Sequence, residues 1–445
     1  MQGMRLWFVL ALTVSLAACG NDDSPAMPTA TPTMTVAPSL TATLAPSATA
    51  TPTLPPTATK TLVPSNTVTP TQTAQPTATP SVLSSSQLLA PGPDGVGVVT
   101  MIFVDDSRPT MANGTYAGSP TRRLATEIWY PIDPGLGVAG QDVRDAPFVS
   151  DGQRHPLVLW SHGFLDFRTG EAYLARQLAS YGYVVAAPDF PLTNMNAPGG
   201  ANIDDVVNQP GDVSFVIDRL LALDADPGSK FAGTIDSDRI AAAGLSLGAL
   251  TTTLTAFHPT LRDPRVRAAV PVAGPGCFFG TSFYQNADVP LLMVAGSIDA
   301  LVPYQANAVF GFGEARAPKY LVTLAGGSHT GFSGAASLLF ENLDNPDDVG
   351  CNAVSGDLGS GDSGPSFLDL LGGADAGIIM GDCPAVCSDP LPRPRAMRPS
   401  RQHQLTILSV LPFLQAEMRA DAGARDFLES TLAAENEDVA VQFDR

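Results

Sequence analysis

The chain has 445 residues, of which 44% are hydrophobic and 15% charged, with 41 glycines and 40 prolines. This composition is too apolar for wholesale disorder and too rich in glycine and proline for an all-helical protein. The formal net charge of −19 disfavours nucleic-acid binding, because phosphate backbones are repelled, and gives no polybasic attraction to anionic lipid. The only apolar run near membrane length is N-terminal and too short to span comfortably, which excludes a multi-pass membrane protein.

Residues 1–18 have the pattern of an export signal. Arg5 precedes an apolar stretch, which closes with Leu16-Ala17-Ala18 before Cys19. This sequence resembles the lipobox of bacterial lipoproteins, which implies that Cys19 becomes a lipid-bearing mature N-terminus. The alternative is an ordinary cleaved signal with an incidental cysteine. We therefore expect an exported protein, lipid-anchored to the cell envelope. Because Gly20 rather than aspartate follows Cys19, the anchor would be in the outer membrane if the host is Gram-negative.

Residues 19–88 predict a disordered tether. Threonine, proline, alanine and serine dominate from residue 24 to about 85, and Lys60 is the only charged residue there. Without an apolar period no core can form, and the prolines favour extended chain. An inert spacer is the simpler interpretation, and an O-glycosylated stalk is the alternative. Residues 89–445 are then long enough for one large domain with a substantial core.

Strand and helix patterns alternate through this domain. Apolar runs predict strands at residues 97–104, 121–131, 157–160, 183–188, 239–244, 266–273, 289–295 and, as the last strand, 320–324. Helical spacing predicts helices at 171–181, 212–223 after a break at 210–211, 247–257 and, as a closing helix kinked at Pro412, 404–419. The expected class is α/β, with a mostly parallel central sheet flanked by helices and antiparallel strands at its N-terminal edge. Residues 335–400 match none of these patterns and form an insertion.

A nucleophile motif lies between a predicted strand and a predicted helix. Residues 244–248 read Gly-Leu-Ser-Leu-Gly and fit the pattern G-x-S-x-G. The bare pattern is weak, but this context makes it specific, because a sharp strand-to-helix turn presents the serine hydroxyl at the sheet edge. Ser246 is therefore the predicted nucleophile.

A candidate acid and a candidate base follow the predicted nucleophile along the chain. Asp299 comes directly after the strand that ends near residue 295, and His329 lies in the loop after the strand that ends near 324. The order Ser246, Asp299, His329 is that of nucleophile, acid and base in α/β-hydrolases. Two other aspartates are weaker candidates: Asp263 is expected to be solvated, and Asp288 lies at the opposite sheet edge.

Acyl transfer also needs two donors for the developing oxyanion. The backbone amides of Phe164 and Leu247 are the candidates, and His162 is expected to brace the loop rather than to act as a base. An aromatic and apolar wall around the site is expected from Phe164 together with four further residues, although local packing is an equally good account of them. These are Leu165, Phe167, Phe278 and Phe279.

Three segments, residues 156–164, 178–189 and 244–249, resemble the α/β-hydrolase superfamily, most closely its platelet-activating-factor acetylhydrolase and dienelactone-hydrolase-like members. The resemblance covers about residues 95–335 and the final helix. It implies an α/β-hydrolase fold and a serine esterase or lipase-like enzyme, with no cofactor or metal, acting on a small ester or lipid. Dienelactone hydrolases use a cysteine nucleophile, so Ser246 favours the acetylhydrolase-like branch.

The four cysteines after Cys19 are Cys277, Cys351, Cys383 and Cys387. In an exported chain they suggest two disulfides, for which three pairings exist, and the last two could close a short loop. Zinc is disfavoured because no histidine lies near them. The acidic stretch 347–362 lacks an EF-hand pattern, so a solvated loop is favoured over a calcium site.

Together these features predict an exported, lipid-anchored serine hydrolase that cleaves carboxylic esters through an acyl-enzyme. Two alternatives remain open. One is a surface-displayed binding protein on an inactive hydrolase scaffold, and the other is an amidase or peptidase. The sequence does not indicate the oligomeric state.

Overall fold

The computed structural model describes residues 83–137, 140–354, 367–379 and 383–445, all within one compact unit, Pro76–Arg445. The predicted signal peptide, Cys19 and nearly all of the predicted tether lie outside the described residues. The first described helix, α1 (Ser85–Leu89), buries Leu88 in the core, so residues before the expected boundary at 89 also belong to the domain. None of the helices described is long and apolar enough to cross a membrane.

In the described part of the chain, ten strands form one sheet in the order β10-β9-β8-β7-β6-β4-β5-β2-β1-β3. The strands are β1 (Gly95–Asp105), β2 (Arg122–Ile132), β3 (Asp142–Arg144), β4 (His155–Ser161), β5 (Val184–Pro188), β6 (Ile235–Leu245), β7 (Val266–Val272), β8 (Leu291–Gly296), β9 (Lys319–Leu324) and β10 (Val439–Asp444). The six strands from β5 to β9 in this order run parallel, whereas β2 and β10 pair antiparallel with their neighbours. The predicted fold class is therefore confirmed.

Helices and helical turns connect these strands. The α-helices after α1 are α2 (Ala172–Ser180), α3 (Gln209–Ala225), α4 (Leu247–Phe257), α5 (Thr281–Tyr284), α6 (Phe310–Glu314), α7 (Ala336–Leu339), α8 (Asp347–Val354), α9 (Phe367–Leu370), α10 (Pro399–Arg419), α11 (Ala422–Asp426) and α12 (Leu432–Glu435). Shorter 3₁₀ or π-helical turns are η1 (Ile203–Asn208), η2 (Gln305–Val309), η3 (Thr330–Phe332), η4 (Gly373–Ala376) and η5 (Phe427–Thr431).

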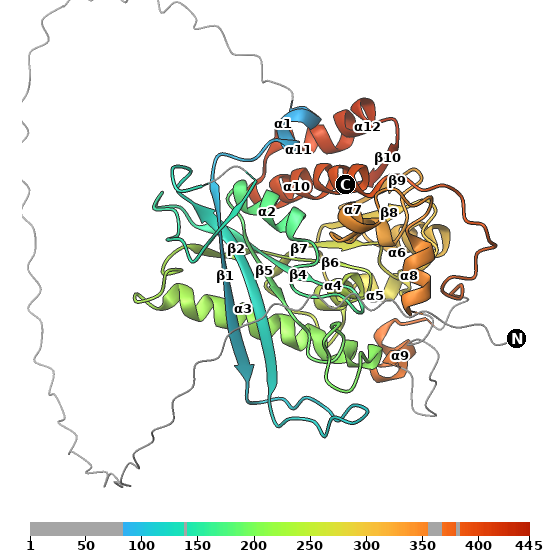
Figure 1. The fold of residues 1–445 in the computed structure, drawn as a ribbon, viewed down its shortest axis with the longest axis horizontal. Helices are drawn as coiled ribbons and strands as arrows, with labels where there is room; N and C mark the ends of the chain where they lie inside the picture. Colours follow the sequence, from blue (N-terminus) through green and yellow to red (C-terminus); the bar gives the residue numbers. More distant parts are fainter. Residues whose placement is uncertain (1–82, 138–139, 355–366, 380–382) are drawn as a thin grey trace, which may run out of the picture. The chain divides into compact units, whose positions relative to one another are not determined.

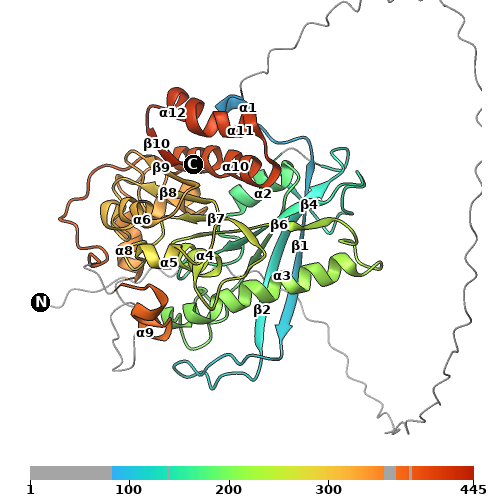
Figure 2. The same ribbon diagram turned by 180° about the vertical axis from the view of Figure 1, so that it is seen from behind.

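The sheet is covered on both faces, as Figures 1 and 2 show from opposite sides. Ala241 and Ala243 of β6 join a core cluster with α2 and α10, whereas Ala242 between them joins a second cluster with α4. A third cluster packs α3 against β4 and β5. Burial on both faces explains why the central strands are continuous apolar runs rather than alternating patterns.

Three expectations about the elements were wrong. The helix after residue 208 includes Pro210 and Gly211 rather than starting after them, because proline in the first turn lacks only an amide that has no helical partner there. The strand at 319–324 is not the last, since β10 pairs antiparallel with it. The helix at 399–419 does not close the chain, because α11, α12 and β10 follow.

Candidate active site

Ser246 lies at the sharp turn between β6 and α4, with φ 57° and ψ −114°. This is a rare and strained conformation for a residue with a side chain. Neighbouring chain leaves no room for side chains beside it: a Cβ on Gly248 would lie 2.0 Å from the Ser161 carbonyl oxygen, and one on Gly244 would lie 2.4 Å from the Gly248 oxygen. The two glycines thus let the turn form, and the serine side chain is half-buried at the sheet edge.

The structure brings Ser246, His329 and Asp299 together in one hydrogen-bonded row. His329 Nε2 lies 2.8 Å from Ser246 Oγ, and His329 Nδ1 lies 2.8 Å from Asp299 Oδ2. The second oxygen of Asp299 accepts the amides of Leu301 at 2.9 Å and Val302 at 2.6 Å. These contacts fit a neutral imidazole that donates from Nδ1 to the carboxylate and accepts the serine proton at Nε2.

The negative charge of Asp299 raises the pKa of His329. Burial alone disfavours the imidazolium, but the Asp299 carboxylate and its hydrogen bond outweigh burial, so the pKa of His329 is raised above its ordinary value. Asp347, whose carboxylate also lies nearby, acts in the same direction on the pKa of His329. Such an arrangement makes the imidazole a stronger base toward the serine hydroxyl.

The two candidate oxyanion donors belong to Phe164 and Leu247, which line the same cavity as Ser246. Neither the Phe164 amide nor the Leu247 amide donates a hydrogen bond to any residue that the structure describes. Gly163 lies so close that a Cβ there would be 3.6 Å from the Ser246 Cβ. His162 donates from Nδ1 to the Gly163 carbonyl at 2.7 Å and accepts the Phe190 amide at Nε2. Both ring nitrogens are therefore used to brace the loop.

The remaining polar candidates lie elsewhere. Asp263 is buried and forms an ion pair with Arg265 at 2.6 Å, which corrects the expectation that it is solvated. Asp288 is exposed and pairs with Arg316. Neither carboxylate forms a hydrogen bond or ion pair with His329 in the described structure.

An apolar cavity of about 350 Å³ opens beside Ser246. Its walls include Phe164, Phe278 and Phe367, and the insertion contributes Val354, Pro384 and Val386. Three of the residues expected here do not reach it. Phe279 is fully buried and stacks on Phe283 at 4.2 Å between ring centroids. Leu165 and Phe167 follow the turn after Phe164, where Leu165 has a φ of 61°, and neither lines the cavity.

One disulfide joins the insertion to a loop at the cavity, and a second lies within the insertion. Cys277 pairs with Cys383, and Cys351 pairs with Cys387. The short loop between the last two cysteines, one of the possibilities left open, is therefore not closed by a disulfide. All four thiols that could have bound zinc are used. Disulfides persist in oxidising compartments, which favours an exported protein.

Sequence reasoning missed two polar residues that contact the histidine loop. Gln402 on α10 accepts the Ser328 amide at 3.2 Å and donates to the Ser328 carbonyl at 2.7 Å. Asp347 was expected in a solvated acidic loop but is fully buried, and its carboxylate accepts the amide of His329. The only local signal was its position after Asn345 and Pro346, where a helix can begin.

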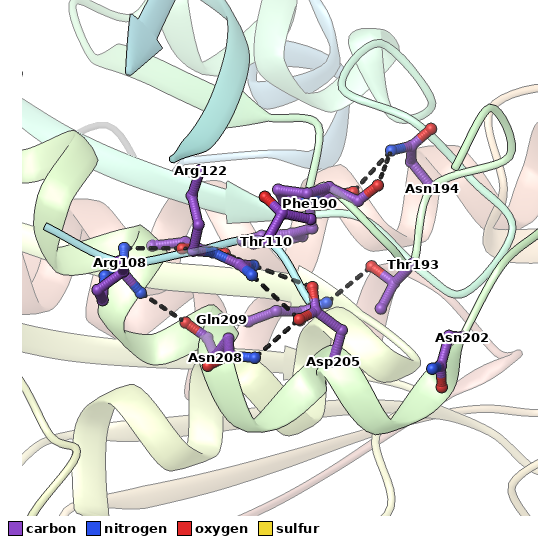
Figure 3. A network of polar contacts seen from close by, with 12 residues as sticks. Arg108, Thr110, Arg122, Phe190, Thr193, Asn194, Asn202, Asp205, Asn208 and Gln209 are labelled. Atoms are coloured by element: carbon purple, nitrogen blue, oxygen red, sulfur yellow. Dashed lines mark hydrogen bonds and ion pairs between the residues drawn. The ribbon is translucent and has the colours of Figure 1, made fainter. Parts of the chain in front are cut away.

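A buried polar network joins β2, η1 and α3 (Figure 3). The guanidinium of Arg122 on β2 binds Asp205 of η1 at 2.9 Å and Asp212 of α3 at 2.6 Å. Burial alone would lower the pKa of Arg122, but the two carboxylates outweigh it and raise it. Nearby, Gln209 donates to Thr193 Oγ1 at 2.8 Å, and the Thr193 carbonyl accepts the Leu165 amide at 3.0 Å. Gln209 and Thr193, rather than Arg122, therefore contact the loop that follows Phe164.

Comparisons with known proteins agree with this fold. Residues 149–341, less than half of the chain, match the family model described as PETase: PET hydrolase-like. No curated protein sequence matches the chain significantly. A solved structure of a ferulic acid esterase from Streptomyces cinnamoneus is similar, with a TM-score of 0.53 and 21% identity over 79% of this chain and 97% of that chain. The chain therefore has the α/β-hydrolase fold, and its central segment resembles the PET hydrolase-like family of ester hydrolases.

Proposed function

We propose that this protein is a serine hydrolase that cleaves carboxylic esters through an acyl-enzyme. The observation that carries the proposal is the hydrogen-bonded row Ser246, His329 and Asp299 beside an apolar cavity. Ser246 attacks the ester carbonyl while His329 takes its proton and returns it to the leaving alcohol. Asp299 holds the imidazole in the required tautomer and stabilises the imidazolium.

The oxyanion of the tetrahedral intermediate would lie between the amides of Phe164 and Leu247. Both amides have no acceptor among the described residues, and Leu247 is the first residue of α4, so the positive end of the helix dipole also faces the site. Water then attacks the acyl-enzyme, with His329 acting as the base.

The cavity supports compact apolar acyl groups as the substrate class. Three phenylalanines among its walls, Phe164, Phe278 and Phe367, suit an aromatic or short branched acid. The names of the similar proteins, a PET hydrolase-like family and a ferulic acid esterase, also refer to esters of aromatic acids. We further propose that the protein is exported and held at the cell envelope through a lipid on Cys19, on the strength of the signal pattern.

A fluorophosphonate probe tests the nucleophile directly. We expect stoichiometric labelling of the wild type, loss of labelling and of esterase activity in Ser246→Ala, and no change in the control Ser229→Ala, whose hydroxyl caps a distant loop. Activity retained in Ser246→Ala would refute the proposal. No labelling of the wild type would favour a binding protein.

A panel of p-nitrophenyl esters from acetyl to palmitoyl, with benzoate and ferulate esters, would define the acyl group. We expect kcat/KM to be highest for acids that fit the cavity and to fall for palmitoyl. Faster cleavage of the matching anilides would instead favour an amidase.

A further inference from the structure

We propose that Asp347 is a positioning residue that fixes the acid and base loops relative to each other. The inference rests on the proposed function, because it concerns how Asp299 and His329 are held for catalysis. Asp347 is the first residue of α8, within the insertion 335–400 that the sequence did not place.

The carboxylate of Asp347 accepts hydrogen bonds from both loops. Its Oδ2 accepts the Ala300 amide at 3.0 Å and the His329 amide at 3.0 Å, and its Oδ1 accepts the Thr330 amide at 2.7 Å. Ala300 directly follows the catalytic acid, and the other two donors are the catalytic base and its neighbour. One side chain thus bridges the main chains that carry Asp299 and His329.

This carboxylate is fully buried and has no ion-pair partner among the described residues. Arg393, which lies against the same helix, pairs instead with Asp348 at 2.5 Å. A buried carboxylate without a cation is costly unless several donors satisfy it. The three amides supply those donors, and they do so only while the two loops keep their present spacing, so the side chain favours that spacing.

The rest of the insertion holds α8 in place. The disulfide between Cys351 and Cys387 ties the helix to a later segment, and the Cys387 amide donates to the Ala300 carbonyl at 2.8 Å. Both polar backbone groups of Ala300 are therefore bound by the insertion. Asn345 accepts the Asp347 amide at 2.9 Å and fixes the start of the helix.

Asp347 also contributes charge to the reacting residues. The charged and titratable side chains that act on His329 are Asp299 and Asp347, and both raise the pKa of His329. Removal of the Asp347 charge should therefore lower the pKa of His329, independently of any effect on stability.

The test compares Asp347→Asn with Asp348→Asn. The control removes the same charge from the next residue of α8, where the side chain is 56% exposed and contacts Arg393. In Asp347→Asn the side-chain NH₂ group replaces one carboxylate oxygen and must face a backbone N–H donor, so the loops should shift. We expect kcat to fall roughly 10²-fold, as for small misplacements of catalytic groups, with KM nearly unchanged. The acid limb of kcat/KM should move to lower pH. The control should show neither change.

A purely structural residue would lower the melting temperature of Asp347→Asn without moving the acid limb, and that outcome would overturn the proposal. If Asp347→Asn does not fold, Asp347→Glu replaces it. Glutamate keeps the charge but is too long to hold all three amides, so kcat should fall while the acid limb stays in place. A wild-type kcat in Asp347→Glu would overturn the proposal. Residual activity in Ser246→Ala would refute the hydrolase mechanism instead, so the two failures are distinguishable.

Discussion

Arg122 and Asp347 are both buried charged residues, but Arg122 binds side-chain carboxylates, whereas Asp347 binds backbone amides. Arg122 is a buried cation that binds the side chains of Asp205 and Asp212 (Figure 3), and it forms no hydrogen bond with the loop that carries Phe164 in the described structure. Asp347 is a buried anion that binds backbone amides of the acid and base loops directly.

Because their partners differ, we expect Arg122 to contribute mainly to stability and Asp347 mainly to catalysis. Breaking a buried ion pair leaves uncompensated charge and mainly costs folding free energy. Loss of main-chain contacts next to the reacting groups changes the geometry of those groups and mainly costs turnover. The comparison predicts that variants on the Arg122 side unfold more easily, whereas variants on the Asp347 side react more slowly.

The largest expected effect is on the acid itself. Asp299→Asn places an amide N–H opposite His329 Nδ1 and favours the wrong tautomer, so under the proposed mechanism kcat should fall about 10⁴-fold, as it does in serine proteases. Steady-state kinetics and a thermal melt measure turnover and folding separately. The control Asp288→Asn changes an exposed carboxylate at the opposite sheet edge and should keep wild-type kcat. A loss below tenfold in Asp299→Asn would assign the role to another carboxylate.

On the other side of the comparison, Arg122→Met should act on stability. It leaves Asp205 buried without a cation, whereas Asp212 keeps its ion pair with Arg108 at 2.8 Å. Removal of one partner of a buried pair costs about 3–5 kcal/mol of unfolding free energy. Arg123→Met is the matched control, because this neighbour on β2 is exposed. Urea unfolding measures the difference. A kcat loss in the folded Arg122 variant as large as that of Asp347→Asn would contradict the proposed separation.

Loss of a disulfide should affect both stability and turnover. Replacing Cys351 and Cys387 by alanine should cost about 2–4 kcal/mol, because the cross-link limits the unfolded chain. It should also lower kcat, since this pair fastens α8 and the segment that binds Ala300. The pair Cys277 and Cys383 is the comparison, because both cysteines line the cavity and their loss should raise KM. Equal kinetic effects of both double variants would contradict the assignment.

The sequence predicted what depends on local patterns. The buried strands, the helix after the nucleophile and the placement of Ser246, Asp299 and His329 followed from apolar runs and from residues just after strand ends. The edge strand β10 was missed because it is only six residues long and mostly exposed, so it lacks the continuous apolar run of the central strands. Proline at position 210 was interpreted as a break, although it is well tolerated in a first helical turn.

The supporting residues could not be found in this way. Arg122 meets its carboxylates 83 and 90 residues later, and Gln402 meets Ser328 across 74 residues. Each is a single polar residue without a motif, so only the tertiary structure identifies its partner. Asp347 was even assigned to solvent, because the acidic stretch around it has the composition of a surface loop.

The smallest predicted effect is the pH dependence of kcat/KM, which reports the pKa of His329. Because burial is outweighed by Asp299 and Asp347, the pKa of His329 lies above its ordinary value near 6.5. The free enzyme needs a neutral imidazole, so kcat/KM should fall as the pH drops through that raised pKa, about tenfold per pH unit below it. The linked stability has the opposite sign: it is fully present below the unfolded pKa and is lost as the pH rises through the folded pKa.

The buried ring of His162 provides the internal control for this titration, because burial lowers its pKa. In a ¹H–¹⁵N NMR titration of the ring nitrogens, His329 should titrate together with the acid limb of kcat/KM, and His162 should titrate at lower pH. An acid limb well below pH 6 would contradict the effect of the two carboxylates on His329. Coincidence of the limb with the His329 titration in the wild type, and a joint downward shift in Asp347→Asn, would assign part of the basicity of His329 to the insertion.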